Sequence, residues 1–160
     1  MQRLIVRYLL AGLVAATCMM VAMPADAQRA PGALGIGGQV GSPSGVTFKV
    51  HNPETISYDF LAAWDLDDFF FLNVHGLYER PLEFENTDNL EYFFGPGAFV
   101  GFQEERGGNN EAVFGISGSF GLNFLLEQRF ELYVHLTPRI NLIPDTTGRL
   151  GGGLGLRYYF

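Results

Sequence analysis

Apolar and polar side chains alternate with a period of two through most of this chain, most clearly between Phe130 and Leu142. Successive side chains of an extended strand point to opposite faces, so this period predicts β-strands with one apolar and one polar face. The apolar face of that segment carries Phe130, Leu132, Val134, Leu136, Pro138, Ile140 and Leu142, and the polar face carries Glu131, Tyr133, His135, Thr137, Arg139 and Asn141.

The same period predicts eight strands along the chain. Most approach the roughly 9 to 11 residues with which a tilted strand crosses a bilayer, whereas strands of soluble proteins average about 5 or 6. After residue 27 no run reaches the roughly 18 to 20 apolar residues that a membrane helix needs. Nothing resembles a linker, so residues 28–160 are expected to form a single all-β domain. The predicted strands are at about 33–40, 45–51, 56–66, 69–79, 90–103, 112–124, 129–142 and 149–160.

The first 27 residues have the pattern of a bacterial secretory signal peptide. Arg3 and Arg7 precede an apolar stretch from Leu9 to Val21, and Ala25-Asp26-Ala27 supplies the small residues of a cleavage site. We expect cleavage before Gln28. A retained membrane anchor is the alternative, because the uncharged stretch is about long enough to span a bilayer.

Cleavage would leave an acidic chain without cysteine. The whole sequence has 10 Lys and Arg against 17 Asp and Glu; without Arg3, Arg7 and Asp26 the balance is 8 against 16, a net charge of −8. This charge argues against a nucleic-acid partner. The single cysteine, Cys18, lies in the predicted leader, so disulfides, thiol catalysis and cysteine-bound metals are excluded.

Alternation alone fits both a membrane barrel and a soluble barrel, which differ in the face that points outward. On the polar face, the large Tyr133, His135 and Arg139 are flanked by small residues at 115–121 and 151–155, as a narrow closed interior requires. Aromatic residues of the apolar faces lie near strand ends, where a membrane barrel has its interfacial girdles, although core aromatics are the alternative interpretation. Both observations favour a polar interior and an apolar exterior. The aromatic residues are Tyr58, Trp64, Tyr78, Tyr92, Phe102, Phe130, Tyr158 and Phe160.

The C-terminal residues 153–160 resemble the signal that marks the last strand of bacterial outer-membrane barrels for the barrel assembly machinery. Gly155, Tyr158 and Phe160 match its glycine and aromatic positions, whereas Gly153 stands where a polar residue is more usual. Together with the leader and the eight strands, the chain is similar to small eight-stranded outer-membrane β-barrel proteins, by pattern rather than by extended motif. The resemblance implies a closed antiparallel up-and-down transmembrane β-barrel in the bacterial outer membrane, with membrane lipid and the assembly machinery as partners.

Two features conflict with this interpretation. Pro96 and Pro138 fall on lipid-facing strand positions, where each implies a bulge or a lost ladder bond. The connection at 80–89 would lie on the periplasmic side, where turns are usually short. Longer strands that meet in a tight turn at Asn86 to Asn89 would remove the second conflict.

Charged and histidine side chains on the polar faces predict a hydrogen-bonded interior, because buried charges need partners. In it Lys49, Arg139 and Arg157 neutralise Asp59, Glu91 and Glu131, and His51, His75 and His135 lie on the same faces. Such an interior implies a plugged barrel. A histidine paired with Asp59 or Asp65 would be the enzymatic alternative. However, no His-x-Ser occurs, and an inward histidine cannot reach lipid, so we expect no enzyme.

Neither glycine-rich nor acidic segments indicate a cofactor or a metal. Gly35–Gly38 and Gly151–Gly155 are not followed by helices, which argues against a phosphate-binding loop and for close strand packing. The acidic loop residues have the composition to share a divalent ion with lipopolysaccharide phosphates, but solvated charge is the simpler interpretation, and calcium-loop spacing is absent. These residues are Asp65, Asp67, Asp68, Glu104, Glu105 and Glu111.

We therefore expect a monomeric integral outer-membrane barrel with a structural or surface-interaction role. Its contact surface would be the short exterior loops near 41–44, 66–69, 104–111 and 143–148. A lipid-modifying outer-membrane enzyme and a soluble periplasmic barrel that binds an apolar ligand are the alternatives.

Overall fold

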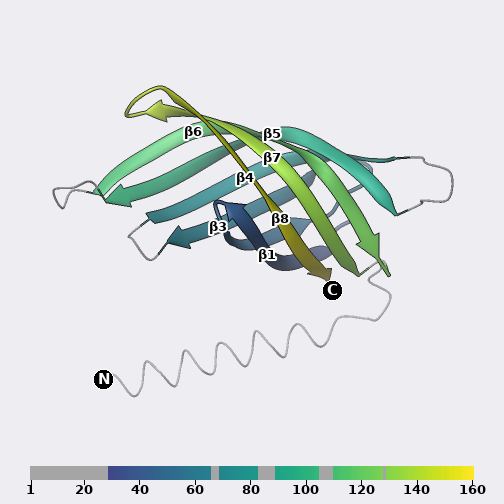
Figure 1. Ribbon diagram of the computed structural model, residues 1–160. Coiled ribbons are helices and arrows are strands. Elements are labelled where there is room, and N and C mark those ends of the chain that lie inside the picture. The colour runs from purple at the N-terminus through teal and green to yellow at the C-terminus, as the bar shows by residue number, and fades with distance from the viewer. Residues whose placement is uncertain (1–28, 66–68, 83–88, 105–109, 128) are drawn as a thin grey trace, which may run out of the picture.

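The computed structural model describes residues 29–65, 69–82, 89–104, 110–127 and 129–160. These residues form eight strands whose order around the sheet follows the chain, each antiparallel to the next, and β8 pairs with β1 to close a barrel (Figure 1). The predicted closed antiparallel all-β fold is confirmed. No helix in the described part is long and apolar enough to cross a membrane. The strands are β1 (Leu34–Ser42), β2 (Gly45–Val50), β3 (Ser57–Asp65), β4 (Phe69–Pro81), β5 (Leu90–Glu104), β6 (Asn110–Leu126), β7 (Phe130–Ile143) and β8 (Thr147–Tyr159).

A single rule of parity governs the described strands. Their buried residues are all odd-numbered and point into the barrel, whereas the exposed large apolar residues are almost all even-numbered and form the outer wall. Lys49 and Glu131 have no exposed side-chain surface, while Val134 on the same strand as Glu131 is 49% exposed. This is the polarity of a transmembrane barrel and the reverse of a soluble one.

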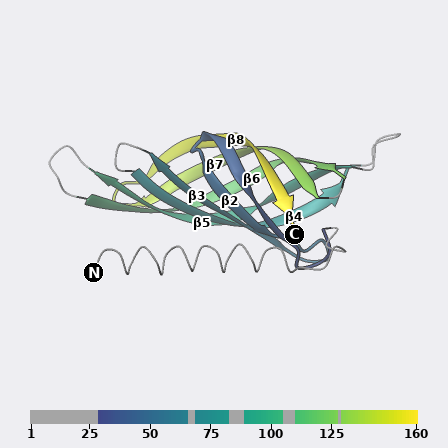
Figure 2. The same ribbon diagram turned by 90° about the horizontal axis from the view of Figure 1, so that it is seen from below.

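Both described chain ends lie at one end of the barrel, because the number of strands is even. We call this the termini end. The C-terminal ends of β1, β3, β5 and β7 lie at the opposite end, which we call the mouth. β2 has 6 residues and β6 has 17, so the wall is taller on the side of the later strands (Figure 2).

The two prolines interrupt the hydrogen-bonded ladder without shifting the register. Between β4 and β5 the pairing passes from His75↔Gly97 to Tyr78↔Phe94, so the positions around Pro96 are unpaired on that side. Between β6 and β7 it skips the positions around Pro138 in the same way. The missing proline N–H thus costs local pairing rather than a bulge. The register shift of this sheet lies elsewhere, between Phe114 and Gly115.

The hairpin at the termini end between β4 and β5 is longer than predicted. β4 runs to Pro81 and β5 begins at Leu90, and Leu82 N donates to Leu90 O at 2.8 Å. The extension of β4 shortens the connection at 80–89, which otherwise would be long for the periplasmic side of a membrane barrel. Residues 83–88, which include part of the suggested tight turn, lie outside the described chain.

Glycines give the large interior side chains their space. A Cβ on Gly155 would lie 2.2 Å from Cζ of Tyr133, its register partner on β7, and a Cβ on Gly121 would lie 2.6 Å from Cζ of Phe93. Tyr133 and Phe93 pack with Leu77 in one interior cluster, and a second cluster near the mouth contains Phe71 and Phe99. The interior is therefore filled by side chains, as expected for eight strands.

Candidate functional site

Glu131 of β7 is the centre of the interior ion-pair network. Arg157 Nη1 donates to its Oε1 at 2.7 Å, and Lys49 Nζ and the Tyr159 hydroxyl donate to its Oε2 at 3.1 and 2.8 Å. Arg29 Nη2 adds a fourth donor at 3.1 Å. A carboxylate without solvent contact is tolerated because its oxygens receive charged donors from several strands.

Glu79 of β4 is a second centre, which the sequence analysis did not single out. Lys49 Nζ forms a very short contact with it, and Ser57 Oγ donates to its Oε2 at 2.5 Å. His51 Nδ1 lies 2.9 Å from the same oxygen, and Asn123 Nδ2 donates to Oε1 at 2.8 Å. The alternation of the sequence could have identified Glu79, because this residue is in phase with the polar residues of its strand.

Arg157 of β8 links Glu131 to Asp59. Its Nη2 donates to Asp59 Oδ1 at 2.5 Å, and its Nε donates to Thr47 Oγ1 at 3.1 Å. The guanidinium carbon lies 3.9 Å from the centroid of the Tyr133 ring, a cation–π contact. All of the nitrogens of this buried arginine thus face acceptors or an aromatic ring.

Arg29, which precedes β1, enters the same network from the termini end. Its Nη1 donates to Glu91 Oε2 at 2.6 Å, and its Nη2 donates to Glu79 and Glu131, each at 3.1 Å. The short segment before β1 thus covers the acidic side of the interior. No strand period places a residue ahead of the first strand, so sequence reasoning missed Arg29.

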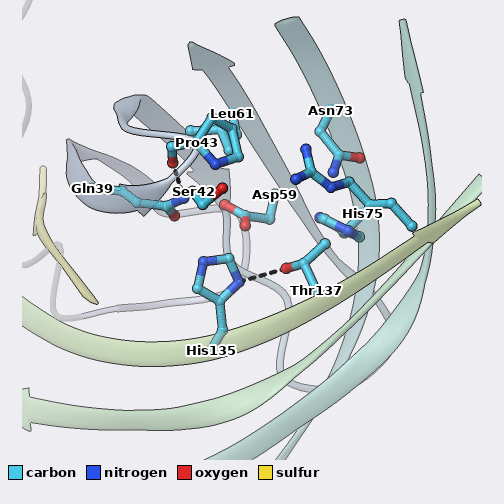
Figure 3. Close-up of a pocket in the computed structure, with 10 residues that line it drawn as sticks. Gln39, Ser42, Pro43, Asp59, Leu61, Asn73, His75, His135 and Thr137 are labelled. Atoms are coloured by element: carbon cyan, nitrogen blue, oxygen red, sulfur yellow. Dashed lines mark hydrogen bonds between the residues drawn. The ribbon is translucent and has the colours of Figure 1, made fainter. Parts of the chain in front are cut away.

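His75 and His135 line a polar cavity nearer the mouth, which shares Asp59 with the ion-pair network (Figure 3). His75 Nε2 lies 3.1 Å from Ser117 Oγ, which donates to Asn73 Oδ1 at 3.0 Å. His135 Nδ1 lies 3.0 Å from Thr137 Oγ1. The cavity is lined by Gln39, Ser42, Pro43, Asp59, Leu61, Asn73, His75, His135, Thr137 and Arg139.

The residues proposed for one network therefore divide into two groups. Lys49, Asp59, Glu131 and Arg157 come together in the network described above. The expectation that Arg139 neutralises a carboxylate is not met among the described residues: its guanidinium carbon lies 5.0 Å from the centroid of Phe71. His75 and His135 also lie outside the main network, because they occupy positions nearer the mouth on their strands.

The residues of the suggested assembly signal lie on both faces of β8. Gly155 points inward beneath Tyr133, and Tyr158 packs on the outer wall against Phe130 and Phe160, with ring centroids 5.1 and 5.0 Å apart. Among the described residues, no group of three or more His, Cys, Asp and Glu could hold a metal ion. The acidic side chains at 65–68 and at 104, 105 and 111 lie outside the described part of the structure.

No protein-family model matches the chain, and no curated protein matches it significantly in sequence. Among solved structures, it is similar to the N-terminal β-barrel domain of Pseudomonas aeruginosa OprF, with a TM-score of 0.60 and 12% identity over 80% of this chain and 96% of that chain. Neisserial surface protein A (NspA) gives a TM-score of 0.48 and 11% identity over 80% of this chain and 94% of that chain. At this identity, the likeness to the OprF domain establishes the eight-stranded barrel fold.

Proposed function

We propose that this chain is an integral outer-membrane β-barrel protein with a structural or surface-interaction role and a side-chain-filled interior. The observation that carries the proposal is the inverted polarity of the wall. Charged residues such as Lys49, Glu131 and Arg157 are buried, whereas Val134, Leu154 and Leu156 are about half exposed. Such an apolar surface is stable against lipid and would aggregate in water.

The aromatic residues of the wall support the same environment. Tyr78 stacks on Phe94 and Phe130 contacts Tyr158 near the termini end, while Trp64 is exposed toward the mouth. Tyrosine and tryptophan are enriched where membrane lipid meets water. By this proposal membrane lipid covers the wall, the C-terminal strand is read by the assembly machinery, and the protein acts as a monomer.

The two alternatives receive less support from the geometry. A soluble barrel that binds an apolar ligand needs an apolar lumen, but this interior contains charged pairs. A lipid-modifying enzyme needs its catalytic histidine within reach of lipid. His51, His75 and His135 all point inward and are buried, so we propose a non-enzymatic role.

Cell fractionation and heat-dependent gel mobility test the membrane proposal. We expect the expressed protein in the outer-membrane fraction. Unboiled and boiled samples should migrate differently on the gel, because a closed barrel resists unfolding by the gel detergent until it is heated. Recovery from the soluble fraction with unchanged mobility would contradict the proposal.

A further inference from the structure

Two arginines occupy paired positions on β7 and β8 near the mouth. Arg139 and Arg149 are register partners of the inward-facing parity; Arg139 is half-buried and lines the cavity, whereas Arg149 is exposed. In the described part of the chain neither forms an ion pair, whereas the other inward cations, Lys49 and Arg157, have carboxylate partners. Like charges directly opposite each other destabilise an antiparallel pair. Among the described residues, no carboxylate neutralises this pair of positive charges, although the chain as a whole is acidic.

Arg139 is held in place and retains hydrogen-bonding capacity. Its guanidinium packs over the Phe71 ring, and a Cβ on Gly151 would lie only 2.9 Å from its Nη2, so the glycine leaves the space that the guanidinium fills. Its Nε is buried and, among the described residues, has no hydrogen-bond partner. A buried donor without an acceptor is costly unless something else supplies one.

His135 supplies a second unpaired group in the cavity that Arg139 also lines. The residue is only 7% exposed. Its Nδ1 lies within hydrogen-bond distance of the Thr137 hydroxyl, while its Nε2 is buried without a partner. Figure 3 shows the bond to Thr137 on one side of the ring, with the other nitrogen directed toward Ser42 and Gln39. When Thr137 donates to Nδ1, the neutral ring carries its proton on Nε2, which is then a free donor.

We propose that Arg139, Arg149 and His135 form a binding site for an oxyanion group, a carboxylate or a phosphate, and we call it the mouth site. Guanidinium groups bind such oxygens through charge-assisted hydrogen bonds, and an anion would both neutralise the arginine pair and satisfy the unpaired donors. Asp59, the carboxylate among the residues that line the cavity, already accepts from Arg157. The orientation of the mouth site toward the cell exterior rests on the proposed function. Its binding of an anion does not rest on that function.

Titration of the refolded mature protein in detergent micelles with inorganic phosphate and with acetate tests the mouth site. The arginine Nε–H signals are followed by NMR, with chloride at equal ionic strength as the reference. We expect saturable shifts with the oxyanions and none with chloride. Arg139→Gln and Arg149→Gln should each weaken binding about tenfold or more, the value of one charge-assisted hydrogen bond. Arg80→Gln, which removes an exposed arginine of the outer wall, should leave the affinity unchanged.

Three results would overturn the mouth site: shifts that do not saturate, equal shifts with chloride, or equal weakening in Arg80→Gln. Thermal unfolding gives an independent measurement if a variant refolds poorly. Phosphate should raise the unfolding midpoint of the unaltered protein and not that of Arg149→Gln, because only a ligand of the folded state stabilises it. A rise of equal size in both proteins would contradict the proposal.

A further arm separates a water-borne anion from a lipid phosphate. In nanodiscs that contain lipopolysaccharide, added phosphate should bind as in micelles, because the mouth site faces the lumen and not the lipid-covered wall. Displacement of phosphate by lipopolysaccharide would overturn the lumenal assignment. Heat-dependent mobility of the same sample tests the membrane proposal separately, so a soluble protein that still binds phosphate would refute the membrane role alone.

Discussion

At the scale of single residues, the interior depends on buried carboxylates, of which Glu131 has no exposed surface. Glu131 receives donors from Lys49, Arg157, Tyr159 and Arg29. A buried ion pair contributes little net stability relative to apolar packing, but removal of one charge leaves its partners uncompensated. The network therefore favours one arrangement of strands, since a slipped register would bury these charges unpaired.

Glu131→Gln should lower the free energy of unfolding by about 3 to 5 kcal/mol, because the buried side chains of Lys49, Arg157 and Arg29 lose the negative charge that they share. Urea unfolding in lipid vesicles measures the change. Glu54→Gln, at an exposed position between β2 and β3, is the matched control and should change stability by less than about 0.5 kcal/mol. Equal effects of the two substitutions would show that the network is not maintained in the membrane.

At the scale of the strand, parity assigns each residue either to lipid or to the lumen. On β7, Val134 and Leu136 are 49% and 45% exposed on the outer wall. Thr137, the next residue of the same strand, is 5% exposed, and its hydroxyl hydrogen-bonds to His135. Neighbouring positions on β7 therefore differ completely in environment, although they are adjacent in the chain.

Val134→Arg or Leu136→Arg should destabilise the barrel by about 2 to 4 kcal/mol, because each places a charge in lipid near the middle of the membrane. Thr137→Arg should instead disturb the packed lumen, and its cost should depend little on bilayer thickness. Unfolding in vesicles of two thicknesses distinguishes the two mechanisms. Equal tolerance of arginine at all three positions would refute the assignment of inside and outside.

At the scale of the whole molecule, closure of the barrel by only eight strands makes the interior narrow enough for side chains to fill it. Eight strands leave an interior that side chains can fill, and here Tyr133, Phe93 and the ion-pair network occupy it. We therefore expect no stable conductance steps when the refolded protein is inserted in planar bilayers. Reproducible single-channel steps would contradict a plugged interior.

The C-terminal aromatic residue offers a separate test of biogenesis. Phe160→Ala removes a ring that packs on the outer wall against Tyr158, so refolding from urea into detergent should be unchanged. Assembly in cells should fall, as measured by the heat-modifiable fraction. If refolding and cellular assembly fell together, the role of Phe160 would be structural rather than a signal.

The amino-acid sequence by itself predicted the number of strands, their approximate positions and the faces that carry Lys49, Glu131 and Arg157. These follow from alternation, which is a local property of an extended chain. Glu79 is in phase with His75 on the polar side of its strand, but the period does not reveal that it is a centre of the network. The end of β4 was less predictable, because ladder bonds extend the hairpin to Pro81, beyond the predicted end at residue 79.

Only the tertiary structure decided which polar side chains meet. Register and closure set the height of each residue in the lumen, and these depend on pairing between distant strands. They bring Arg29 to three carboxylates, join Asp59 to Arg157, and leave Arg139 opposite Arg149 rather than in the main network. The local period determines the face of a side chain, whereas contacts across the closed lumen determine its partner.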